Sequence, residues 1–134
     1  MTLDEFFRGR DESRRIFDAL REAVASIGPA ELRITKSQVA FRHGPDAARG
    51  QGPGAVSGRR VAFAWAWMPD VYLGPGHAPL VLTLAFRRRD PSPRWKQIVE
   101  PVPGRFTHHL ELYSADAVDD QVRAWFKEAW KASA

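Results

Sequence analysis

The chain has 134 residues, the common size of one domain, and its composition, 44% hydrophobic and 27% charged, is ordinary for a globular protein. It contains no cysteine, which excludes disulfides, thiolate nucleophiles and cysteine-ligated zinc. No apolar run approaches the roughly 20 residues of a membrane span, and the N-terminus lacks the pattern of a secretory signal. We expect one cytoplasmic domain, residues 1–134, without a metal or cofactor.

Basic residues outnumber acidic ones, which gives the chain a net charge of +4 and an isoelectric point near 10.0. Such a charge attracts nucleic acids and acidic proteins. Arg greatly outnumbers Lys, and Ala, Gly and Pro are abundant, so a bias in coding accounts for the same composition. The charge therefore permits an acidic partner without selecting one.

The N-terminal region predicts two helical segments. Thr2 and Glu5 have the spacing of a capping box, in which each side chain bonds to the backbone N–H of the other residue. A longer helix should follow, because apolar residues recur at the helical period, and Gly28-Pro29 predicts its end, with the glycine as a left-handed cap. These apolar residues are Ile16, Phe17, Leu20, Val24 and Ile27.

After Pro29 the apolar period changes to two, the period of a β-strand. Short strands are expected around residues 32–34 and 39–41, with Lys36 and Ser37 at a turn or bulge between them. Residues 43–60 are rich in Gly, Ala and Pro and predict a long mobile connection.

Residues 61–68 predict a central strand with two apolar faces. Alanines occupy one face and allow a helix to approach closely. Phe63, Trp65 and Trp67 occupy the other face, and we expect them to fill a deeper layer of the core, although such a stripe can also stack nucleic-acid bases beside Arg42.

The C-terminal half predicts two more long strands, at residues 80–86 and 105–113, with an irregular segment and one short edge strand between them. A final helix is predicted by the apolar stripe over 118–129, with Ser114 or Asp116 as its cap. Together these elements predict an α+β fold: a single twisted, mainly antiparallel sheet of about four to six strands with an N-terminal and a C-terminal helix.

Two adjacent histidines, His108 and His109, lie in the last predicted strand and must point to opposite faces, so they cannot share a metal ion. His108 falls on an apolar face and should be buried with a hydrogen-bond partner. His109 shares the polar face with Glu111, where an imidazole beside a carboxylate suits acid–base work or pH sensing. A solvated sheet face explains the same pattern.

The run from Arg87 to Lys96 is a basic and aromatic cluster that includes Arg88, Arg94 and Trp95. It begins where the strand pattern ends, so we expect an exposed loop that suits a nucleic acid or an acidic protein. An ordinary solvated loop has the same composition.

Several short motifs spread over nearly the whole chain resemble those of one family. They are Lys36-Ser37-Gln38-Val39-Ala40-Phe41, Phe63-Ala64, Pro103-Gly104, His108-His109, Asp119, Trp125 and Ala129. On these residues the chain resembles a family of small bacterial domains of unknown function, which also occur at the C-terminus of proteins described as predicted transport proteins. The resemblance implies an α+β sheet with terminal helices and supplies no catalytic residue or cofactor. The segment 43–60 is longer than is typical of that family.

The leading functional hypothesis is a non-enzymatic binding or accessory module that engages an acidic partner through the polar sheet face and the loop 87–96. The alternative is a small-molecule pocket or minor enzyme in which His109 and Glu111 act with Lys36 and Ser37. A homodimer formed through an exposed apolar sheet face is a third arrangement.

Overall fold

The structure, a computed structural model, describes residues 1–44 and 61–133. The sequence predicted a long connection over residues 43–60, and all of it after Gly44 lies outside the described residues. In chain order the elements are α1 (Leu3–Phe6), α2 (Asp11–Ala25), β1 (Ala30–Ile34), β2 (Val39–His43), β3 (Ala62–Trp67), α3 (Asp70–Leu73), β4 (Leu80–Phe86), β5 (Gln97–Val102), β6 (Arg105–Leu112), the 3₁₀ turn η1 (Ala115–Ala117) and α4 (Asp120–Ala132).

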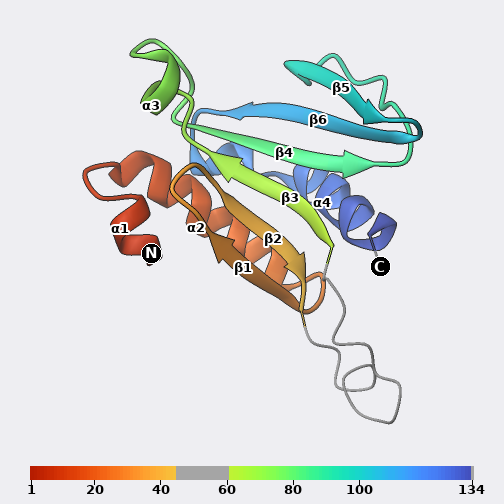
Figure 1. The fold of residues 1–134 in the computed structure, drawn as a ribbon, viewed down its shortest axis with the longest axis horizontal. Helices are drawn as coiled ribbons and strands as arrows, with labels where there is room; N and C mark the ends of the chain where they lie inside the picture. Colours follow the sequence, from red (N-terminus) through yellow and green to blue (C-terminus); the bar gives the residue numbers. More distant parts are fainter. Residues whose placement is uncertain (45–60, 134) are drawn as a thin grey trace, which may run out of the picture.

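The six strands form one antiparallel sheet in the order β1-β2-β3-β4-β6-β5. Figure 1 shows the two long helices, α2 and α4, lying across the same face of this sheet. The predicted α+β fold with terminal helices is thereby confirmed. The opposite face carries neither long helix, and we call it the open face.

The core lies between the sheet and the two long helices. Phe41 of β2 is stacked on Phe17 of α2, with ring centroids 5.7 Å apart, and meets Phe126 of α4 edge to face at 5.2 Å. All three rings are fully buried. Ala64 and Ala66 face the same layer, and their small side chains let the helices approach β3, as the sequence predicted.

A β-bulge in β3 breaks the alternation that the sequence predicted for its aromatic residues. Phe41 pairs with Ala64 and Arg42 pairs with Ala62, so Phe63 has no partner on β2. The bulge places Phe63 in the helix-covered core, where it is fully buried against Phe126. Trp65 and Trp67 are half-buried on the open face. The prediction that the three rings share one deep layer is therefore wrong.

The helix termini confirm one sequence prediction and correct two. Thr2 and Glu5 form the capping box of α1, with both reciprocal hydrogen bonds present. The cap of α4 is Asp119, whose carboxylate accepts from the Val122 N–H, and neither Ser114 nor Asp116 takes this role. Gly28 is not a left-handed cap; a Cβ there would lie 2.6 Å from the Trp130 ring, so the residue must be small for packing.

Candidate functional site

One row of side chains crosses the open face from edge to edge, because residues opposite each other in a sheet share a face. The pairing of the strands sets this row as Arg33, Ala40, Trp65, Thr83, His109 and Gln97. Thr83 is a small residue near the centre of this row, and the larger rings of Trp65 and His109 stand on either side of it. Large rings beside a small residue leave a depression above β4.

A hollow of about 450 Å³ occupies this depression, which we call the aromatic hollow. Its volume lies within the range of small-ligand sites. Its walls combine flat rings with hydroxyl, amide and imidazole groups, and none of the described residues that line it is acidic. The lining residues are Ser37, Gln38, Trp65, Trp67, Tyr72, Thr83, Thr107 and His109.

A chain of hydrogen bonds joins three of the lining residues. The Trp67 indole N–H donates to the Thr83 hydroxyl at 3.3 Å, and the Thr83 hydroxyl lies 2.8 Å from His109 Nδ1. Thr83 is buried, and the described residues offer its proton no other acceptor. We therefore assign the donation from Thr83 to Nδ1, which leaves the His109 proton on Nε2. Burial lowers the pKa of His109 and keeps the ring neutral near pH 7.

One polar contact holds each tryptophan ring of the aromatic hollow in place. Trp67 is fixed by its bond to Thr83. Trp65 lies beneath the Arg105 guanidinium, whose carbon is 5.9 Å from the ring centroid, and Arg105 in turn donates to the Ala62 carbonyl. Rings that are already ordered lose little conformational entropy when a ligand stacks on them.

Tyr72 enters the aromatic hollow from the short helix α3. An ion pair between Arg10 and Asp70 ties this helix to the region before α2. The Tyr72 side chain remains 55% exposed. It therefore offers a third flat ring with much of its surface open to solvent.

The structure brings together only part of the polar group predicted from the sequence. Ser37 and His109 both line the aromatic hollow. Lys36 is exposed in the turn between β1 and β2, as predicted, but does not line the hollow. Glu111 lies on the same strand and face as His109, and it is paired with Lys96 at 3.3 Å. Its charge is thus compensated.

The predicted basic and aromatic loop 87–96 is exposed at Arg87, Arg88, Arg89 and Lys96, as the sequence predicted, whereas Trp95 is buried and belongs to a network of internal contacts. Trp95 is only 8% exposed, and its indole N–H donates to Asp90 at 2.9 Å. Asp90 also forms an ion pair with Arg88, which binds Glu128 of α4 through two hydrogen bonds. The partners of Arg88 and Trp95 are therefore within the chain.

Arg94 and Arg42 also carry ion pairs that the sequence did not predict. Arg94 binds Asp119 and the Ala117 carbonyl, and so joins the loop to the start of α4. Arg42 binds Glu31 at 2.7 Å across the β1–β2 pair. Because each positive charge already faces a carboxylate, neither residue is a strong candidate for an acidic partner.

His108 confirms its prediction as a buried histidine with hydrogen-bond partners. It is fully buried, its Nε2 accepts from the Asp90 N–H at 3.0 Å, and its Nδ1 lies 3.2 Å from the Phe106 carbonyl. An accepting Nε2 requires the proton on Nδ1, which donates to that carbonyl. Burial lowers the pKa of His108 and outweighs the partners that favour its charged form.

Two negative findings apply to residues 1–44 and 61–133. No group of three or more His, Asp or Glu side chains there is arranged to hold a metal ion. No helix in the same part of the chain has the length and apolar character needed to cross a membrane.

Comparison of the chain with family models, curated proteins and solved structures gave no match. The resemblance to a family of small bacterial domains thus stays a prediction.

Sequence reasoning missed several residues of the open face. Tyr72 and Thr83 carry no motif, and Trp67 was assigned to the core. In the sequence, Arg105 is only the first residue of a predicted strand, and its contact with Trp65 is seen in the structure alone. The available signal was the polar Thr83 in the otherwise apolar strand β4, because a polar residue in a central strand needs a partner.

Proposed function

We propose that this chain is a non-enzymatic binding module for single-stranded nucleic acid, with bases that stack on Trp65 and Trp67 in the aromatic hollow. The observation that carries the proposal is the placement of both rings on the open face of the sheet rather than in the core. Sheet faces with exposed aromatic side chains are a recurrent platform for unpaired bases, since every base has a π-face.

The charges on the open face support an anionic ligand. Arg105 and Arg33 have no carboxylate partner among the described residues, whereas Glu111 and Glu31 are paired with Lys96 and Arg42. The acidic groups of this face are thus compensated while positive charge remains. This arrangement favours a phosphate backbone next to the stacked bases, and such binding weakens as salt is added.

Removal of the stacking platform should weaken oligonucleotide binding strongly. We expect Trp67→Ala to raise the Kd for a fluorescently labelled oligothymidylate about tenfold, because one base–aromatic stack contributes about 1–3 kcal/mol. Fluorescence anisotropy measures the Kd at low and moderate salt, and circular dichroism checks that the variant is folded. Trp65→Ala should have a similar effect.

Tyr113→Ala provides the matched control. Tyr113 is an exposed aromatic residue of the same face that does not line the aromatic hollow, and its loss should leave the Kd unchanged. Equal affinity of wild type and Trp67→Ala would contradict the proposal. Absence of binding together with dimerisation in sedimentation would instead favour a homodimer through this face.

A small-molecule site at His109 is the second candidate, and the Trp67–Thr83–His109 chain favours it. This chain presents an oriented Nε2–H in the hollow, which suits a neutral hydrogen-bond acceptor on a ligand. We expect His109→Gln to abolish salt-resistant thermal stabilisation by such a ligand and to leave oligonucleotide affinity within about twofold, the size of a weak contact. A thermal-shift screen of metabolites at high salt provides the measurement. If no metabolite stabilises the wild type, this candidate fails.

A further inference from the structure

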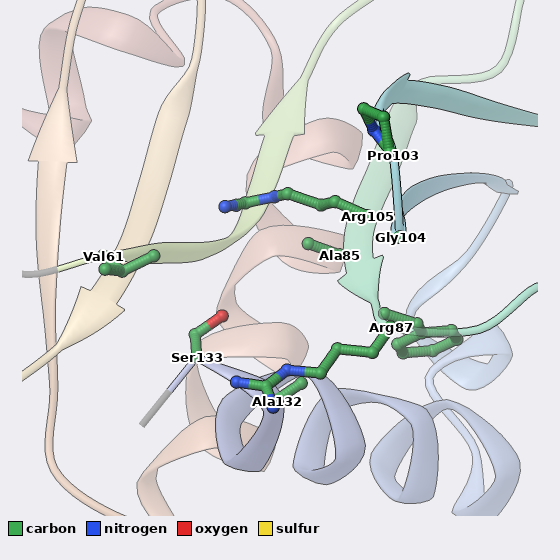
Figure 2. Close-up of a pocket in the computed structure, with 9 residues that line it drawn as sticks. Val61, Ala85, Arg87, Pro103, Gly104, Arg105, Ala132 and Ser133 are labelled. Carbon is green, nitrogen blue, oxygen red and sulfur yellow. The ribbon is translucent and has the colours of Figure 1, made fainter.

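A second pocket, of about 340 Å³, lies where β4 ends and β6 begins. We call it the arginine pocket. Figure 2 shows Arg87 extending from the end of β4 over Ala132, while Arg105 extends from the start of β6 towards β3. The Ser133 hydroxyl oxygen lies between the two guanidinium groups in this view. Two charged forks and one hydroxyl group thus line the same cavity.

Among the described residues, no acid compensates the positive charge in the arginine pocket. None of the described residues that line it is acidic, and neither Arg87 nor Arg105 has a carboxylate partner among the described residues. Glu100 is a carboxylate near the lining residue Gly104, whose backbone N–H it accepts at the β5–β6 turn. The end of α4 adds only partial negative charge, about half an elementary charge. The two full positive charges of Arg87 and Arg105 exceed this partial negative charge.

Arg105 is already oriented for a ligand. Its guanidinium donates one hydrogen bond to the Ala62 carbonyl at 3.1 Å and lies over the Trp65 ring. A guanidinium has five N–H donors, so this single bond leaves others available. A planar fork matches two oxygens of a phosphate or carboxylate, which makes arginine pairs common in oxyanion sites.

The arginine pocket lies at the end of the sheet, beside the C-terminus of α4, and the aromatic hollow is its neighbour along β4 and β6. Thr83 lines the hollow and Ala85 lines the pocket, and these residues are two apart on β4. Two residues of a strand span about 7 Å. On β6, Thr107 and Arg105 repeat this spacing, and the Arg105 guanidinium over Trp65 joins the two cavities. A group the size of one nucleotide can reach both.

We propose that the arginine pocket binds a phosphate group of the strand whose bases stack in the aromatic hollow. This inference rests on the proposed function and adds to it a defined phosphate subsite. Arg105 orients the phosphate beside Trp65, and Arg87 closes the pocket from the opposite side. The chemical class of the ligand is a phosphate monoester or diester attached to a flat base.

Binding of inorganic phosphate and of deoxythymidine 5′-monophosphate tests the pocket directly. We expect both to shift the backbone NMR signals of Gly104 and Arg105 in the wild type, whereas thymidine should shift signals in the aromatic hollow alone. Arg87→Met should weaken phosphate binding about tenfold, the loss of one charge-assisted contact. Arg21→Met, which removes an exposed arginine of α2 outside both cavities, should bind like the wild type.

Unchanged signals of Gly104 and Arg105 in phosphate, or an Arg87→Met affinity equal to that of the wild type, would overturn the phosphate subsite. A different pattern is expected if the phosphate subsite exists but the proposed nucleic-acid function is wrong. Phosphate binding would then depend on Arg87, whereas Trp65→Ala and Trp67→Ala would leave oligonucleotide affinity unchanged. The pocket would in that case bind a free phosphate compound. A tighter affinity for the monophosphate than for inorganic phosphate supports the link between the two cavities.

Discussion

Replacement of Phe63 by alanine is expected to lower the free energy of unfolding by about 4 kcal/mol, the usual cost of a large aromatic-to-alanine cavity in a core. Phe63 is fully buried and contacts Phe41, Phe126 and His43. Since it joins the sheet to α4, the cavity cannot close without moving the helix. Urea denaturation followed by circular dichroism measures the loss.

Trp65→Ala is the matched control for Phe63, because both are aromatic residues of β3. The half-buried Trp65 contacts Arg105 on the open face, so its removal should cost only about 1 kcal/mol. Strict strand alternation would instead place both rings in one layer and give similar losses. Equal destabilisation by the two substitutions would therefore contradict the bulge in β3.

Asp90→Ala is expected to destabilise the protein by about 3 kcal/mol, because it leaves buried donors without an acceptor. The carboxylate accepts from the Trp95 indole and the Ser92 N–H, and it pairs with Arg88. Thermal unfolding should show a loss of about 10 °C in Tm for a chain of this size. Asp116→Ala, at an exposed aspartate with no side-chain partner among the described residues, should leave the Tm unchanged. A similar Tm for Asp90→Ala and Asp116→Ala would contradict the structural role of the Asp90 carboxylate.

The pH dependence of stability should show two separate windows. Burial lowers the pKa of His108 below its ordinary 6.5, so the unfolded state binds more protons and stability falls as the pH drops below about 6.5. Burial alone would raise the pKa of Asp90, but its hydrogen bonds and Arg88 outweigh burial and lower it below 3.8. A further loss is thus expected below about pH 4. Urea denaturation at several pH values should show a smaller second loss in Asp90→Ala than in the wild type, because Asp119, whose pKa is also lowered, remains.

Local sequence patterns determined most of the elements of this fold. The helical apolar stripes predicted α2 and α4, strand alternation predicted β4 and β6, and the Thr2–Glu5 spacing predicted the cap of α1. The burial of His108 was also predictable, because its neighbours at i±2 are apolar. These features depend on residues close in the chain, whose periodicity fixes which side chains share a face.

The tertiary structure alone decided where the candidate site lies. The bulge opposite Phe41 and Arg42 separates Phe63 from Trp65, and a strand partner that is distant in sequence sets this irregularity. Ion pairs of Arg88 with Glu128 and of Arg94 with Asp119 compensate two charges of the predicted basic loop, and each pair spans at least 25 residues. Likewise, Arg87 and Arg105 share a pocket only because β4 pairs with β6. Such contacts depend on strand order and register, which no local pattern records.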